Sequence, residues 1–149
     1  MNRFINEFQP QETDVTVCGS MTHKDKWLGV VEELKSRGLR VATPDLSEKT
    51  DWSQLTEGEI IEQKGWLVRR HIANIASTKA VLICNYEKQG KTNYIGSNTF
   101  LEMGVAFAYG KPVYVLHKLP EQDNREEMLA LEPIELDGNI ERLVEEVTK

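Results

Sequence analysis

Hydrophobic and polar positions alternate along this chain between two kinds of segment. Short apolar runs of four to six residues, bounded by glycine, proline or polar residues, predict buried strands. The predicted strands cover residues 15–19, 39–43, 80–85, 113–116 and 133–136. Longer segments between them place apolar residues three and four positions apart, which predicts amphipathic helices. The predicted helices cover residues 23–37, 57–77, 99–109 and 140–147.

Individual residues indicate where these elements end. In the first predicted helix, Trp27, Val31 and Leu34 share one face, and Gly38 stands where a helix commonly ends in a left-handed residue. Pro44 stops the second strand. Two polar segments, residues 46–56 and 86–97, are predicted to be loops.

The order of the elements predicts the fold. Apolar strands that alternate with helices are typical of a parallel sheet covered on both faces, with right-handed crossovers. We therefore predict an α/β fold: a single-domain three-layer sandwich with a five-stranded parallel flavodoxin-like sheet in the order 2-1-3-4-5. Residues 1–13 are interpreted as a polar leader and residues 14–149 as the one domain. A site is expected at the carboxyl ends of the first, third and fourth strands.

Composition narrows the range of partners. The 149 residues are 40% hydrophobic and 28% charged, as in an ordinary globular domain. Eighteen basic against twenty-four acidic residues give a net charge of −6, which argues against a nucleic-acid polymer as partner. No apolar run approaches the roughly 20 residues of a membrane span, so we expect no membrane partner.

The cysteines and the N-terminus suggest a cellular location. Cys18 and Cys84 both lie in apolar strands, which suits a reducing compartment, and residues 1–14 have no apolar signal-peptide core. We therefore expect a cytoplasmic protein. No group of His, Cys, Asp and Glu has metal-ligand spacing, so we predict no metal, and we predict no cofactor.

One carboxylate stands out. Between Thr99 and Gly110, Glu102 is the only residue charged at pH 7 in a helix that is apolar nearly all round. Thr99 and Glu102 match a capping box, in which Glu102 would bond back to the amide of Thr99. Alternatively, Glu102 lies in the first turn at the carboxyl edge of the sheet, where the helix dipole keeps it ionised and able to act as a nucleophile. The two interpretations are compatible.

Five segments together resemble a known family. They are the Gly19-Ser20 turn, the strand at 80–85, the glycine-bearing polar loop at 86–97, the Thr-Phe-Leu-Glu-Met-Gly-Val-Ala run at 99–106 and the Gly-Lys-Pro turn at 110–112. This arrangement is similar to that of the nucleoside 2-deoxyribosyltransferases and the related deoxynucleoside-monophosphate N-glycosidases. The resemblance spans residues 15–118.

The resemblance implies a reaction and roles for particular residues. Glu102 matches the glutamate that attacks the anomeric carbon of a nucleoside or nucleotide and forms a glycosyl ester, which another base or water then resolves. Ser20 matches the turn that holds the sugar or its 5′ substituent. Where the family has an acidic residue after the third strand, this chain has Asn85, which can hydrogen-bond a hydroxyl or a base edge but cannot transfer a proton.

Further residues are candidates for substrate binding. Gly19, Ser20 and His23 follow the first strand, where a helix N-terminus can hold an anion; a tight turn explains the glycine and serine equally well. The others precede or open the helix of Glu102: Tyr94, Ser97 and Asn98. His71, on the apolar face of its helix, is interpreted as a core or interface histidine rather than a catalyst.

The sequence is compatible with two functions from different classes. The first is N-glycosidic bond cleavage or base exchange through a covalent glycosyl-glutamate intermediate. The second is a non-catalytic nucleotide-binding or regulatory module on the same fold, with Glu102 as a cap. In both cases we expect a homodimer or larger homo-oligomer, because one sheet cannot cover every face of the apolar helix of Glu102.

Overall fold

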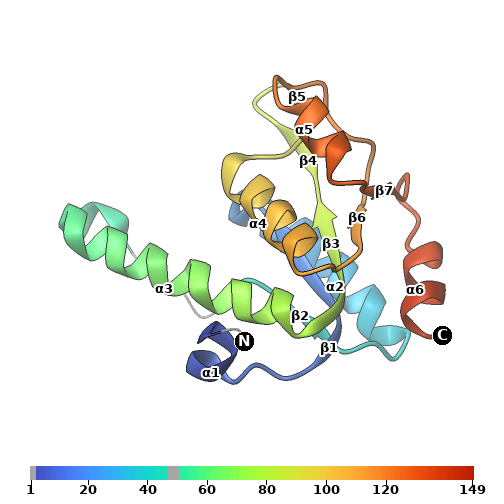
Figure 1. Cartoon of the computed structure of the whole chain (residues 1–149). Coiled ribbons are helices and arrows are strands. Elements are labelled where there is room, and N and C mark those ends of the chain that lie inside the picture. Colours follow the sequence, from blue (N-terminus) through green and yellow to red (C-terminus); the bar gives the residue numbers. More distant parts are fainter. Residues whose placement is uncertain (1–2, 47–50) are drawn as a thin grey trace.

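One parallel sheet forms the centre of the molecule (Figure 1). The computed structural model describes residues 3–46 and 51–149, and within them this sheet has five strands in the order β2-β1-β3-β6-β7. The strands are β1 (Thr13–Gly19), β2 (Val41–Ala42), β3 (Thr78–Cys84), β6 (Val113–Val115) and β7 (Ile134–Glu135). The predicted flavodoxin-like order is confirmed.

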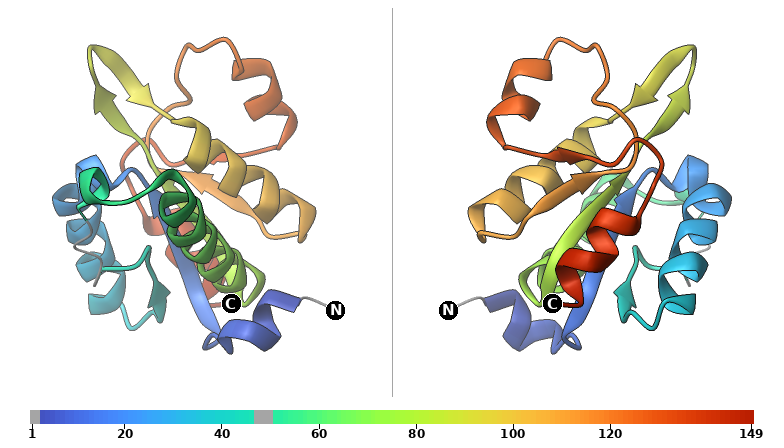
Figure 2. Two further views of the ribbon diagram at one scale, coloured as in Figure 1. Left: turned by 90° about the vertical axis from the view of Figure 1, so that its left-hand side faces the viewer. Right: turned by 90° about the vertical axis from the view of Figure 1, so that its right-hand side faces the viewer.

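Helices cover both faces of the sheet (Figure 2). The described helices are α1 (Arg3–Phe8), α2 (Lys24–Ser36), α3 (Glu57–Ala76), α4 (Ser97–Ala108), α5 (Arg125–Ala130) and α6 (Glu141–Val147), with short 3-10 turns η1 (Met21–His23) and η2 (Trp52–Gln54). One core contains buried residues of α2 and α6, and the other contains buried residues of α3, α4 and α5. The three-layer sandwich is therefore as predicted.

Alternate residues of each strand enter the two cores. Along β3, Ala80 and Leu82 pack toward α2 and α6, whereas Val81 and Ile83 pack toward α3 and α4. Successive side chains of a strand point to opposite faces, so burial of both faces requires a continuous apolar run. This is the physical reason that the strand at 80–85 was predictable from the sequence.

The turn after β1 is held by close contact with α2 and β3. The indole Nε1 of Trp27 donates a hydrogen bond to the carbonyl of Ser20 at 3.0 Å. A Cβ atom on Gly19 would lie 3.1 Å from Cδ1 of Trp27 and 3.2 Å from the carbonyl oxygen of Cys84. Glycine therefore allows the carboxyl ends of β1 and β3 to lie against the start of α2.

The predicted loop at 86–97 is wrong. It contains a β-hairpin of β4 (Tyr86–Lys88) and β5 (Lys91–Tyr94). Gln89 and Gly90 both have positive φ, 53° and 80°, as the two central residues of a tight hairpin turn require. The sequence lacks the Asn-Gly pair that usually marks such a turn, and its polar strands form a separate two-stranded sheet that shows no apolar alternation.

The segment interpreted as a polar leader, residues 1–13, contains a short helix that the sequence pattern did not indicate. Residues 3–8 form α1, and Phe8 packs edge-on against Trp66 of α3 with ring centroids 5.7 Å apart. Residues 1–2, and residues 47–50 of the predicted loop at 46–56, lie outside the described residues. Among the described helices, none combines the length and apolar character needed to cross a membrane.

Candidate active site

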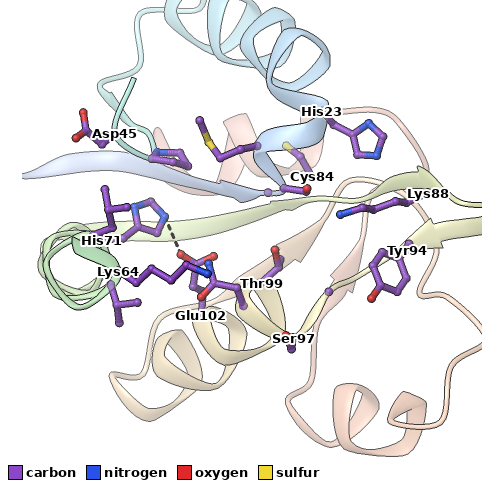
Figure 3. Close-up of a pocket in the computed structure, with 18 of the residues that line it drawn as sticks. His23, Asp45, Lys64, His71, Cys84, Lys88, Tyr94, Ser97, Thr99 and Glu102 are labelled. Atoms are coloured by element: carbon purple, nitrogen blue, oxygen red, sulfur yellow. Dashed lines mark ion pairs between the residues drawn. The ribbon is translucent and has the colours of Figure 1, made fainter. Parts of the chain in front are cut away.

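A cavity of about 700 Å³ opens at the carboxyl ends of β1 and β3, beside the N-terminus of α4 (Figure 3). Its volume lies in the usual range of about 300–1,000 Å³ for small-molecule sites. Seven of the eight predicted site residues line it: Gly19, Ser20, His23, Tyr94, Ser97, Asn98 and Glu102.

The topology explains this position. From β1 the chain passes to α2 on one face of the sheet, whereas from β3 it passes through the hairpin to α4 on the other face. Neighbouring parallel strands whose connections diverge in this way leave a crevice at their carboxyl ends. The cavity occupies this crevice between β1 and β3.

The start of α4 differs from the prediction. The helix begins at Ser97 with Gly96 as its N-cap, two residues earlier than expected, and the Phe100 amide donates to the Gly96 carbonyl at 2.9 Å. Glu102 is therefore in the second turn, too far along the helix to cap it. The predicted capping box at Thr99 is wrong for this reason.

Burial controls the protonation of Glu102. Its side chain is 14% exposed and points into the cavity, and Oε2 lies 3.4 Å from Nε2 of His71. Burial raises the pKa of Glu102 to about 8, because a carboxylate is poorly solvated in an apolar enclosure. Desolvation thus opposes the ionisation that the helix dipole was expected to maintain, and a pKa of about 8 favours the protonated carboxyl group at neutral pH.

His71 is the neighbour of Glu102 across the two helices. It is buried on α3, and its Nε2 lies 3.3 Å from Sγ of Cys18 on β1. Burial, and secondarily the charge of Arg70, lower the pKa of His71 to about 4, so the imidazole is neutral. The buried location predicted for His71 is confirmed, but this side chain also lines the cavity and contacts the candidate nucleophile. With both groups uncharged, the carboxyl group of Glu102 carries its proton and the imidazole of His71 keeps a single N–H.

Cys18, His71 and Glu102 bring three donor atoms within 4.8 Å of one another. A transition metal can be bound by a thiolate, an imidazole and a carboxylate. Hydrogen bonding around Nε2 of His71 explains the same proximity without an ion, and burial raises the pKa of Cys18 well above its usual value, which keeps the thiol neutral. The prediction of no metal stays a prediction.

Two lysines reach the cavity from different elements. Lys64 lies on α3, seven residues before His71 and on the same side of the helix, and Lys88 lies on the hairpin. Their charges suit an anionic group on a ligand. From the sequence, Lys64 was expected only as part of the helix at 57–77, and Lys88 was interpreted as a solvated loop residue rather than part of a phosphate site. The recurrence of polar residues at positions 64 and 71 on an otherwise apolar face was the available signal.

Asn85 does not line the cavity. Its side chain is buried, and Nδ2 donates to the carbonyls of Asn93 at 3.2 Å and Lys118 at 3.1 Å. Its Oδ1 accepts from the His117 amide at 3.0 Å. These bonds join the base of the hairpin to the segment after β6. The amide of Asn85, which was predicted to contact sugar or base, therefore bonds to the protein backbone instead.

Comparisons with known proteins do not assign this chain to a family. No model of a known protein family matches it, and a comparison with curated proteins finds no match. The resemblance to the deoxyribosyltransferases stays a prediction, and the chemistry of the cavity is the basis for a function.

Replacing Asn85 with alanine tests its structural role. The change removes the partner of the Asn93 and Lys118 carbonyls and of the His117 amide in partly buried hydrogen bonds, so the free energy of unfolding should fall by about 1–3 kcal/mol. Urea denaturation measures it. The control Asn98→Ala, at an exposed asparagine of the cavity rim, should stay within about 0.5 kcal/mol of the wild type. Equal stability of the two variants would contradict the structural assignment of Asn85.

The protonation of Glu102 makes stability depend on pH. Its pKa is about 8 in the folded protein and near 4.5 when unfolded, so the folded state binds more protons between these values and loses stability as pH rises through them. From pH 6.5 to 8, Glu102→Gln should therefore gain at least about 1 kcal/mol relative to the wild type, measured by urea denaturation at each pH. Glu62→Gln, on an exposed position of α3, should follow the wild type. A gain for Glu102→Gln that is independent of pH would contradict this protonation.

Proposed function

We propose that this protein cleaves or exchanges the N-glycosidic bond of a nucleoside or nucleotide through a covalent glycosyl-glutamate intermediate. The observation that carries the proposal is the carboxyl group of Glu102, which is buried in the cavity beside His71. A carboxylate that is shielded from water is a competent nucleophile toward a sugar carbon. The predicted site residues, except Asn85, lie around the same cavity.

The cavity offers groups for each part of such a substrate. Ser20, Ser97 and Asn98 supply hydroxyl and amide groups that suit sugar hydroxyls. Lys64 and Lys88 suit a 5′-phosphate. The aromatic ring of Tyr94 suits stacking against a purine or pyrimidine base.

In this reaction, ionised Glu102 attacks the anomeric carbon and the base departs with the electron pair of the glycosidic bond. Attack of water on the resulting ester releases the free sugar, whereas attack of another base gives an exchanged nucleoside. Two displacements at the same carbon retain its configuration.

A non-catalytic nucleotide-binding module is the second candidate. It is favoured by the raised pKa of Glu102, because a neutral carboxyl group is a poor nucleophile but a good hydrogen-bond donor. It predicts saturable binding of a nucleotide without a product.

Product analysis separates the two candidates. Purified protein is incubated with deoxy- and ribonucleosides and their 5′-monophosphates, with and without a second free base, and analysed by liquid chromatography. We expect free base from the wild type and at least about 10³-fold less from Glu102→Gln, which keeps the shape of the side chain but cannot attack.

The other outcomes are equally informative. Full turnover by Glu102→Gln would exclude Glu102 as nucleophile. A thermal shift with a nucleotide but no product would support the binding module, and an exchanged base would identify a transferase.

We also propose that the protein forms a homodimer or larger homo-oligomer. Leu101 and Phe107 on α4 are 50% and 46% exposed, and Ile61 and Trp66 on α3 are 64% and 42% exposed. The N-terminal half of α3 projects beyond the neighbouring elements (Figure 1). Large apolar side chains on two adjacent helices suit burial against a second copy.

Light scattering tests this assembly. At micromolar concentration, the wild type should have at least twice the mass of the chain, and Leu101→Glu combined with Phe107→Glu should reduce it to that of a monomer, because buried charge opposes the interface. Leu129→Glu, at an exposed leucine of α5, is the matched control and should not alter the mass. A monomeric wild type would exclude this expectation.

A further inference from the structure

We propose that His71 is the proton-transfer partner of Glu102: it takes the carboxyl proton, supplies it to the departing base and then takes a proton from the attacking water. The inference rests on the proposed function and deepens it. The acid–base role is assigned to a residue of α3 because Asn85 does not fill it. Asn85 stands where the family has an acidic residue, but its amide cannot transfer protons and is hydrogen-bonded to the backbone.

The geometry selects His71 for this role. Its Nε2 lies 3.4 Å from Oε2 of Glu102, and the two side chains are only 6% and 14% exposed. Within residues 3–46 and 51–149, no lysine or arginine nitrogen lies within 4.0 Å of the Glu102 carboxyl group. The carboxyl proton therefore has one basic group as its immediate acceptor, and His71 also lines the cavity that would hold the base.

The environment of His71 suits transfer rather than storage of a proton. The imidazole has no carboxylate other than Glu102 within ion-pair distance in the described part of the chain, and Nε2 also lies near the neutral thiol of Cys18. Burial lowers the pKa of His71, so an imidazolium formed there is a stronger acid than it would be in water. Such a group releases its proton readily to a departing base.

The first displacement begins with a proton transfer. The proton of Glu102 moves to Nε2 of His71, which leaves a carboxylate beside an imidazolium. The carboxylate oxygen forms a bond to the anomeric carbon while the bond from that carbon to the base nitrogen breaks, and its electron pair goes to the base. The imidazolium gives its proton to the base, directly or through one water, so the base leaves neutral and His71 becomes neutral again.

The second displacement restores the starting state. A water molecule attacks the anomeric carbon, and His71 takes one of its protons as the bond to the Glu102 oxygen breaks. The sugar leaves with a new hydroxyl group, and the proton returns from His71 to the carboxylate. Over the cycle, one water is consumed, and the proton lost with the base is replaced by a proton from water.

Leaving groups of different basicity test this assignment. His71→Gln keeps a polar side chain but cannot carry a proton. We expect it to release base from the nucleoside or nucleotide substrate at least about 100-fold more slowly than the wild type. From the matching 4-nitrophenyl glycoside at pH 9, where Glu102 is ionised without the help of His71 and the phenolate leaves without protonation, the first release should stay within about tenfold of the wild type.

The second step gives an independent measurement. With the 4-nitrophenyl glycoside, His71→Gln should release about one equivalent of nitrophenolate rapidly and then turn over slowly, since water attack lacks its base. Intact mass spectrometry should show the protein increased by the mass of the sugar. The adduct should be absent when Glu102→Gln is combined with this variant.

Matched variants separate proton transfer from packing. Cys18→Ala changes the other neighbour of the imidazole and should keep the ratio of nucleotide to nitrophenyl rates of the wild type. His71→Asn repeats the test should His71→Gln fail to fold. Equal losses on both kinds of substrate, without an adduct, would overturn the role of His71 while leaving Glu102 as nucleophile. No product from the wild type with any substrate would overturn the proposed function and this inference together.

Discussion

The cavity depends on the burial of both faces of one parallel sheet. With helices packed against each face, the polar ends of the strands are the places where the chain can present functional groups to a ligand. Gly19 brings the end of β1 close to the carbonyl of Cys84 at the end of β3, and Trp27 fixes the turn through the Ser20 carbonyl. The position of the candidate site thus follows from the packing of both faces of the sheet, which leaves the carboxyl ends of β1 and β3 open to a ligand.

Burial also determines the electrostatics of this edge. An N-terminal turn of a helix favours a negative charge, but Glu102 is one turn farther along and enclosed by α3, α4 and β1, so removal from water determines its state. The same enclosure makes His71 neutral. A carboxyl group that would be ionised in water and an imidazole that would be partly protonated there are both uncharged here, and a ligand that brings positive charge to the cavity would favour an ionised carboxylate.

The sequence predicted those parts of the structure that follow from periodic burial. Strands such as β3 and helices such as α2 repeat apolar residues at fixed spacing, and strand order followed from their alternation. The hairpin of β4 and β5 was missed because its strands are polar and lie outside the two cores. The contact between His71 and Glu102 could not be predicted, because it joins two helices whose relative rotation depends on packing rather than on either local pattern.

The buried amide of Asn85 has a kinetic consequence. Its three hydrogen bonds fix the base of the hairpin to the segment after β6 as the chain folds. The conformational entropy of ordering the hairpin, which contributes Lys88 and Tyr94 to the cavity, is therefore lost during folding. Ligand binding does not have to order this segment again. With the hairpin already ordered, the association rate should be governed by diffusion and orientation. Ligands of different affinity should then differ mainly in their dissociation rates.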